Sequence, residues 1–130
     1  MIRTEGKSNQ EIVDEIFEVL VKQGKRCMKN GVCAHADGEG NHCAFGLLLD
    51  PANKEIMRFD EDSLSTVIKF PDNLGPNSKF INSNLEMISI LQEIHDAEHH
   101  DHSGFRLSLL SKKFNIKSEW ADKWVAMRFG

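Results

Sequence analysis

The sequence has no hydrophobic run long enough to cross a membrane. Its longest apolar stretch, residues 43–49, is interrupted by Gly46 and followed by Asp50 and Pro51, whereas a membrane-spanning helix needs about 20 consecutive apolar residues. The first seven residues also lack the apolar core of a secretory signal. We therefore expect neither a membrane span nor a membrane partner.

The sequence has few cysteines, and their number is odd. The three cysteines are Cys27, Cys33 and Cys43, whereas small secreted domains are stabilised by an even set of cysteines joined as disulfides. The odd number argues against such a framework and favours a reducing compartment. We expect a cytoplasmic protein.

An excess of basic residues is also missing. Sixteen Lys and Arg stand against 20 Asp and Glu, which gives a net charge of −4. A chain that binds nucleic acid without sequence preference carries a broad basic surface, so we do not expect nucleic acid as a partner. The glycine-rich motifs of phosphate loops and dinucleotide-binding folds are absent as well.

The composition that remains is that of one ordinary globular domain. The chain has 130 residues, of which 40% are hydrophobic and 28% are charged, and it shows no internal repeat or interdomain linker. A chain of this length has room for a single core. We expect one domain over residues 1–130.

Several segments carry helix signals. Ser8 and Glu11 form the Ser-x-x-Glu pattern of a capping box, and apolar residues follow at helical spacing toward Gly24. A long helix is predicted from Asn77 or Ser78 to Gly104. Further helices are predicted over 105–114 and after the candidate cap Ser118, and a short buried turn of helix over 46–49. Residues 58–76 give mixed signals: a short helix is one interpretation of 64–70, and the region as a whole is not placed.

Two short runs, 32–36 and 42–45, flank the turn-forming cluster 37–41. This arrangement is typical of a β-hairpin. The predicted fold class is therefore α+β and mainly helical, with four or more helices and one small β-hairpin.

Cys43 is the first candidate for chemistry. If the chain turns helical after it, the thiol lies at a helix N-terminus, where the backbone N–H groups stabilise a thiolate. His95 is the candidate base of a small hydrolase, although His95 and Asp96 point about 100° apart on one helix and are not expected to bond to each other. The simpler interpretation is that Cys43 is a buried core residue.

A second candidate is a metal site. On one continuous helix, His95, His99 and His102 would form a three-imidazole stripe that could bind Zn²⁺ for hydrolysis. A fourth ligand could come from Cys33, His35, His42 or Cys43. The alternative is that His95 continues the apolar stripe of the helix as a buried, hydrogen-bonded histidine, and that no cofactor is bound.

The third candidate is a ligand site at the hairpin. The basic cluster of Lys22, Lys25, Arg26 and Lys29 surrounds Gly24 and Gly31, and glycines allow a ligand close to the backbone. Basic residues also complement the end of a helix, which is the structural interpretation. The predicted ligand-binding residues are Lys25, Arg26, His35, His42, Cys43 and His95.

Trp120 and Trp124 are spaced as i and i+4 near the C-terminus. We expect this pair to pack on the core or on a second copy of the chain. A homo-oligomer formed through the C-terminal helix is therefore a possible assembly.

The order of several segments is distinctive. Residues 43–46 read Cys-Ala-Phe-Gly after a glycine-containing turn, and residues 91–96 read Leu-Gln-Glu-Ile-His-Asp. The chain resembles a group of short uncharacterised phage and bacterial proteins, in which a Cys-Ala-x-Gly segment precedes a Leu-Gln-x-x-His-Asp segment. The resemblance covers most of residues 10–116. It implies a phage or bacterial accessory protein, acting in the host cytoplasm if phage-encoded, and it assigns no catalytic residue.

The function that we expect is binding without turnover, either of a host protein or of a small anionic ligand. The predicted pocket lies where the hairpin, the turn at Cys43 and the end of the helix at His95 converge. A hydrolase that uses Cys43 and His95, or a metal site at His95, His99 and His102, is the alternative.

Overall fold

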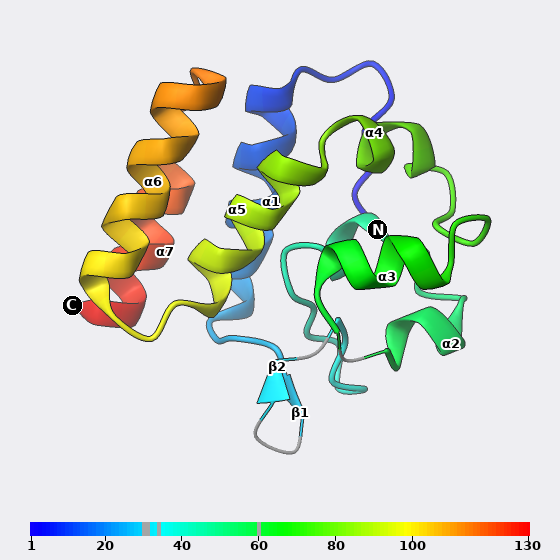
Figure 1. Cartoon of the computed structure of the whole chain (residues 1–130). Helices are drawn as coiled ribbons and strands as arrows, with labels where there is room; N and C mark the ends of the chain where they lie inside the picture. The colour runs from blue at the N-terminus through cyan, green and yellow to red at the C-terminus, as the bar shows by residue number, and fades with distance from the viewer. Residues whose placement is uncertain (30–31, 34, 60) are drawn as a thin grey trace.

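Seven α-helices form the fold in the computed structural model, which describes residues 1–29, 32–33, 35–59 and 61–130. Helices α1, α5, α6 and α7 lie together in one half of the molecule, and α2, α3 and α4 lie in the other (Figure 1). Helix α7 packs against α1 and α6, and α5 packs against α3, α4 and α6. The elements are α1 (Asn9–Gln23), β1 (Met28–Lys29), β2 (Val32–Cys33), the 3₁₀ helix η1 (Gly46–Leu48), α2 (Lys54–Met57), α3 (Ser63–Lys69), α4 (Ser78–Ser83), α5 (Leu85–Asp96), α6 (His100–Phe114) and α7 (Glu119–Phe129).

The predicted α+β class is wrong, because the protein is all-helical. Strands β1 and β2 pair over two residues each, which is too short to make a sheet layer. Among the described residues, the only strand-like pairing between the predicted strands 32–36 and 42–45 is a bridge between Ala36 and His42, beside which the N–H of Cys43 donates to the carbonyl of His35. The second run cannot continue as a strand, because Cys43 already accepts a hydrogen bond from the backbone N–H of Leu47 at the start of η1. Ala34, in the first run, lies outside the described residues.

Helix α1 begins and ends where the capping box at Ser8 and the glycine at residue 24 predicted. The Ser8 side chain accepts a hydrogen bond from the N–H of Glu11, and the Glu11 carboxylate accepts one from the N–H of Ser8. Gly24 ends the helix with φ of 83°, a left-handed conformation that glycine adopts without steric cost. The apolar face of α1 is buried in the core.

The predicted long helix 78–104 is three helices. Helix α4 ends where the side chain of Asn84 binds the carbonyl of Phe80. Helix α5 ends at Asp96, because the next residue, Ala97, has a ψ of 136°, which is not helical. Helix α6 then starts at His100, five residues before the predicted start, so Gly104 lies inside a helix. The apolar stripe cannot run through this region, because residues 98–102 are polar and exposed.

Residues 58–76, which the sequence did not place as a whole, contain α3, and its bounds lie close to the short helix considered over 64–70. Asp62 caps this helix by accepting a hydrogen bond from the N–H of Ser65. Asp60 lies outside the described residues. Helix α7 starts after Ser118 as predicted, with the Ser118 side chain bound to the N–H of Ala121.

The N-terminal segment (residues 1–7) is fixed to the domain by one buried side chain. The Oδ1 atom of Asn77 accepts hydrogen bonds from the N–H and hydroxyl of Thr4, and its Nδ2 donates to the carbonyls of Ile2 and Leu48. Within the part of the chain that the structure describes, no helix combines the length and apolar character needed to span a membrane.

Candidate functional site

A chain of hydrogen bonds ties the central loop (residues 35–46) to α3. The Cys43 thiol lies 3.4 Å from Nδ1 of His35, and Nε2 of His35 lies 2.9 Å from the Thr66 hydroxyl. The hydroxyl of Thr66 donates to the carbonyl of Asp62, so the same hydroxyl accepts the proton of Nε2. Nδ1 is therefore the acceptor on the ring, and the thiol of Cys43 donates to it.

Both members of this pair are covered. Cys43 is 1% exposed and His35 is 4% exposed, and the sulfur also accepts a hydrogen bond from the N–H of Gly46. Burial raises the pKa of the Cys43 thiol, and this effect exceeds that of the Gly46 hydrogen bond, which lowers it. A nucleophile requires an accessible thiolate, so the geometry favours Cys43 as a buried structural residue.

The raised pKa of Cys43 predicts a loss of stability at alkaline pH. In the unfolded chain the thiol ionises near its ordinary pKa of 9.0, whereas in the folded protein it stays protonated. This contribution is therefore fully present below pH 9.0 and is lost as the pH rises toward the folded pKa, by about 1.4 kcal/mol per pH unit. Urea denaturation of the protein and of Cys43→Ser at neutral and alkaline pH measures it, and an equal alkaline slope in the two proteins would contradict it.

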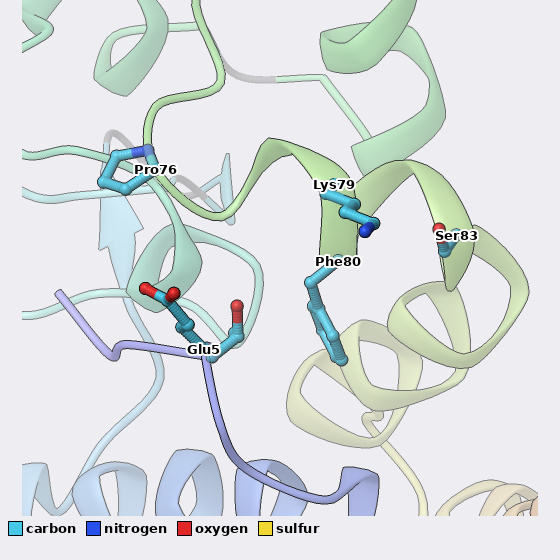
Figure 2. A pocket seen from close by; sticks show the side chains of 6 residues that line it. Glu5, Pro76, Lys79, Phe80 and Ser83 are labelled. Atoms are coloured by element: carbon cyan, nitrogen blue, oxygen red, sulfur yellow. The ribbon is translucent and has the colours of Figure 1, made fainter.

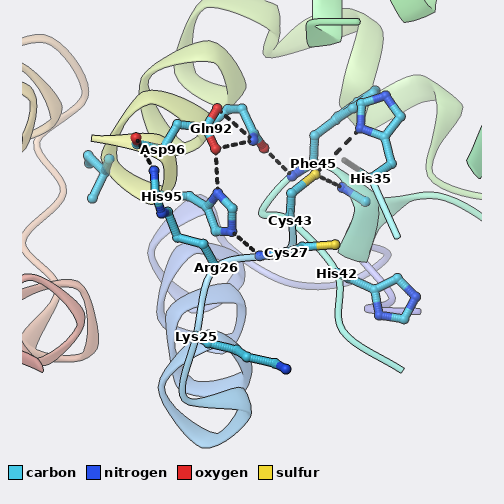
Figure 3. A network of polar contacts seen from close by, with 12 residues as sticks. Lys25, Arg26, Cys27, His35, His42, Cys43, Phe45, Gln92, His95 and Asp96 are labelled. Atoms are coloured by element: carbon cyan, nitrogen blue, oxygen red, sulfur yellow. Dashed lines mark hydrogen bonds and ion pairs between the residues drawn. The ribbon is translucent and has the colours of Figure 1, made fainter. Parts of the chain in front are cut away.

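His95 belongs to a second buried network, at the end of α5 (Figure 3). The backbone N–H of Cys27 donates to its Nε2 over 3.4 Å, so the ring proton is on Nδ1, which lies 2.6 Å from the Asp96 carboxylate. The expectation that His95 and Asp96 do not bond to each other was wrong. Asp96 is the last residue of α5, where the backbone leaves the helix.

This second network also fixes the end of α5. The imidazole of His95 stacks on the indole of Trp124, with centroids 5.5 Å apart and an angle of 8° between the planes. Arg26 donates to the carbonyl of Asp96, and Arg128 donates to the carbonyl of His95. Two cationic side chains therefore bind the last carbonyls of the helix, where its dipole favours positive charge.

The two networks are neighbours joined by one side chain. Gln92 accepts a hydrogen bond from the N–H of Phe45 in the central loop and donates to the carboxylate of Asp96. The turn at Cys43 and the His95 end of α5 therefore converge. The imidazole bonded to the thiol is nevertheless His35 and not His95, which corrects the predicted Cys43 and His95 pair.

The predicted zinc site does not assemble. His95 is fully buried, whereas His99 and His102 are exposed beyond the end of α5. No group of three or more potential ligands is present among the described residues, and the side chain of Cys33 lies outside them. The stripe required one continuous helix, which the break at residues 97–99 removes.

A cleft beside the central loop, the α2 cleft, presents positively charged groups. It has a volume of about 350 Å³ and is lined by Ala36, Gly38, His42, Pro51, Lys54, Met57 and Arg58. This volume lies in the range of small-molecule sites. The basic groups come from α2 and its C-cap, the imidazole comes from the central loop, and none of these lining residues is acidic.

Gln23, the last residue of α1, positions His42. Its side-chain amide accepts from the N–H of His42 over 2.8 Å and donates to the carbonyl of His42 over 3.0 Å. Burial lowers the pKa of His42 below its ordinary 6.5, and the N-terminal ammonium lowers it further, against the opposing effect of Asp37. The imidazole is therefore neutral at pH 7, and an anion beside it would favour its protonated form.

The predicted ligand residues are thus divided among three places. His42 lines the α2 cleft, whereas His35, Cys43 and His95 are buried in the two networks. Lys25 is exposed and points away from the networks, and Arg26 caps α5 (Figure 3). The predicted basic cluster also included Lys29 and Gly31. The side chain of Lys29 and the whole of Gly31 lie outside the described part of the chain.

Sequence reasoning missed Lys54 and Arg58. Their i,i+4 spacing after Asn53, which caps α2, indicates that they share a helix face. Nothing in the sequence indicates that this short helix lies beside His42. No protein-family model matches the chain, and neither a curated protein nor a solved structure matches it.

Proposed function

We propose that the protein binds a small organic anion in the α2 cleft, as an accessory protein without turnover. The observation that carries the proposal is the convergence of Lys54, Arg58 and His42 on one cavity with no acidic lining residue. Two permanent cations and a third nitrogen donor match the oxygens of a carboxylate, sulfonate or phosphate.

The lining also selects for an organic ligand. Met57, Pro51 and Ala36 supply apolar surface beside the cations, and Met57 itself is 7% exposed and held in the core. An inorganic anion would leave this surface in water, whereas an anion that carries an apolar group would cover it.

Catalysis lacks comparable support. The thiol of Cys43 and the imidazoles of His35 and His95 are covered by the protein, and their partners within the two networks hold them in place. A hydrolase that uses these groups would first have to open the core.

Benzenesulfonate tests the proposed site, because its charge does not change near neutral pH. We expect Lys54→Met and Arg58→Met each to weaken its binding by about tenfold or more, since a hydrogen bond to a charged group contributes about 1.5–3 kcal/mol. Isothermal titration calorimetry measures the affinity. Lys112→Met, an exposed position on α6, is the matched control, and uncharged benzyl alcohol should not bind.

The affinity should also depend on pH through His42. Protonation adds a third positive charge to the cleft, so benzenesulfonate should bind more tightly as the pH falls from about 7.5 to about 5.5. His42→Gln should remove this dependence. Equal affinity in the wild type, Lys54→Met and Arg58→Met would contradict the proposal.

A further inference from the structure

A second cavity lies on another part of the molecule, between the N-terminal segment and α4. It has a volume of about 530 Å³ and is lined by Thr4, Glu5, Pro76, Lys79, Phe80 and Ser83. Figure 2 shows Glu5 on the N-terminal segment across from Lys79 and Phe80 on α4. None of these residues lines the α2 cleft.

The walls of this cavity are fixed before any ligand arrives. Asn77, which is 2% exposed, uses both atoms of its side-chain amide to hold the N-terminal segment against the start of α4, through Thr4 on one wall. The N–H of Ile2 also donates to the carbonyl of Leu47. A preformed cavity binds with less loss of conformational entropy than one that must close.

The two walls carry opposite charges. Glu5 and Lys79 are both exposed, and neither forms an ion pair with any described residue. The nearby Lys7 is already paired with Glu15. The cavity therefore presents one carboxylate and one ammonium group that are both available to a ligand.

An aromatic surface lies beside the two charges. The ring of Phe80 is half-buried and lines the cavity together with Pro76. The hydroxyl of Ser83 adds a polar group on the Lys79 side of α4. The arrangement is complementary to a molecule that carries an ammonium, a carboxylate and an apolar group on one small frame.

We propose that this cavity binds a zwitterionic amino acid with an apolar side chain. The ammonium of the ligand pairs with Glu5, its carboxylate pairs with Lys79, and its side chain packs on Phe80. A simple anion satisfies only Lys79 and is repelled by Glu5, so the site differs in ligand class from the α2 cleft. This proposal does not depend on the function proposed for that cleft.

Titration of the ¹⁵N-labelled protein with L-phenylalanine tests the proposal by two-dimensional NMR. We expect the amide signals of Lys79, Phe80 and Ser83 to move, and those of His42 and Arg58 to stay. L-phenylalanine methyl ester lacks the carboxylate and N-acetyl-L-phenylalanine lacks the ammonium, so each should bind this cavity about two- to fivefold more weakly, the effect of losing one exposed ion pair.

Variants separate the two charges. Glu5→Gln and Lys79→Met should each weaken L-phenylalanine binding about two- to fivefold. Both positions are exposed, so the fold should be kept. The matched controls are Glu55→Gln and Lys112→Met, also exposed. Unmoved signals at Lys79, Phe80 and Ser83 up to the solubility limit, or equal affinity for the neutralised analogues, would overturn the proposal.

Discussion

Replacing Gly46 with alanine should destabilise the protein by about 3 kcal/mol or more, because the new methyl group has no room. A Cβ at residue 46 would overlap the backbone carbonyl oxygen of His35 and lie 3.0 Å from its carbon. That carbonyl also accepts a hydrogen bond from the N–H of Cys43. The backbone at His35 would therefore have to move away from η1. Urea denaturation measures the free energy of unfolding.

Gly104 provides the matched control. It lies inside α6, and a Cβ built there meets nothing within 4 Å. Because alanine favours a helix more than glycine does, Gly104→Ala should stabilise the protein by about 1 kcal/mol. A similar small effect of both substitutions would show that the backbone of His35 does not lie against Gly46 as described.

Replacing Trp124 with alanine should have the second large effect, a loss of about 3–5 kcal/mol. The indole is fully buried, stacks on His95 and donates from Nε1 to the carbonyl of Ile94 over 3.4 Å. Its removal leaves a cavity between α7 and the end of α5 and uncovers the imidazole. Thermal or urea unfolding followed by circular dichroism measures the loss.

Trp120, one turn earlier on α7, is the comparison. It is only half-buried, and its ring contacts the ammonium of Lys123 at 4.3 Å from the centroid. Trp120→Ala should therefore cost about 1 kcal/mol. If Trp120→Ala were the more damaging change, the core side of α7 would be misassigned. Trp124 is already buried within its own chain, so Trp120 is the member of the pair that a second copy could contact. Light scattering on both variants measures the subunit number and so tests the predicted homo-oligomer.

The parts of the fold that could be predicted are those whose signals are local. The capping box at Ser8, the glycine stop at Gly24 and the cap at Ser118 act through hydrogen bonds within a few residues. The breaks in the predicted long helix could not be read in this way. Asn84 bonds to the preceding turn, and the polar residues 98–102 fit a helix surface as well as a connection.

The hairpin prediction was correct for the turn and wrong for the strands on either side of it. Asp37 accepts hydrogen bonds from the N–H groups of Glu39 and Asn41, so the cluster 37–41 does form a tight turn. A turn that brings Ala36 and His42 together does not oblige the next residues to pair. The chain enters η1 instead, because its apolar residues are buried in the core there.

The candidate site was found only in part for a similar reason. The sequence predicts that the turn at Cys43 and the end of the helix at His95 converge, and in the structure Gln92 joins them. The sequence does not indicate which imidazole meets the thiol. His35 faces Cys43 across the turn 37–41, and its ring is held there by the hydroxyl of Thr66 on α3, which is distant in the sequence. Lys54 and Arg58 become visible as site residues only once α2 lies beside His42.

The pairing of the first helix with the last has a consequence for how the chain is made. Helix α1 lies against α7, and Gln10 exchanges two hydrogen bonds with the backbone of Lys117. During synthesis, the apolar face of α1 leaves the ribosome long before α7, on which it packs, has been made. This apolar face can be covered only after α7 has been synthesised, so the domain closes late, through contacts between residues far apart in the sequence.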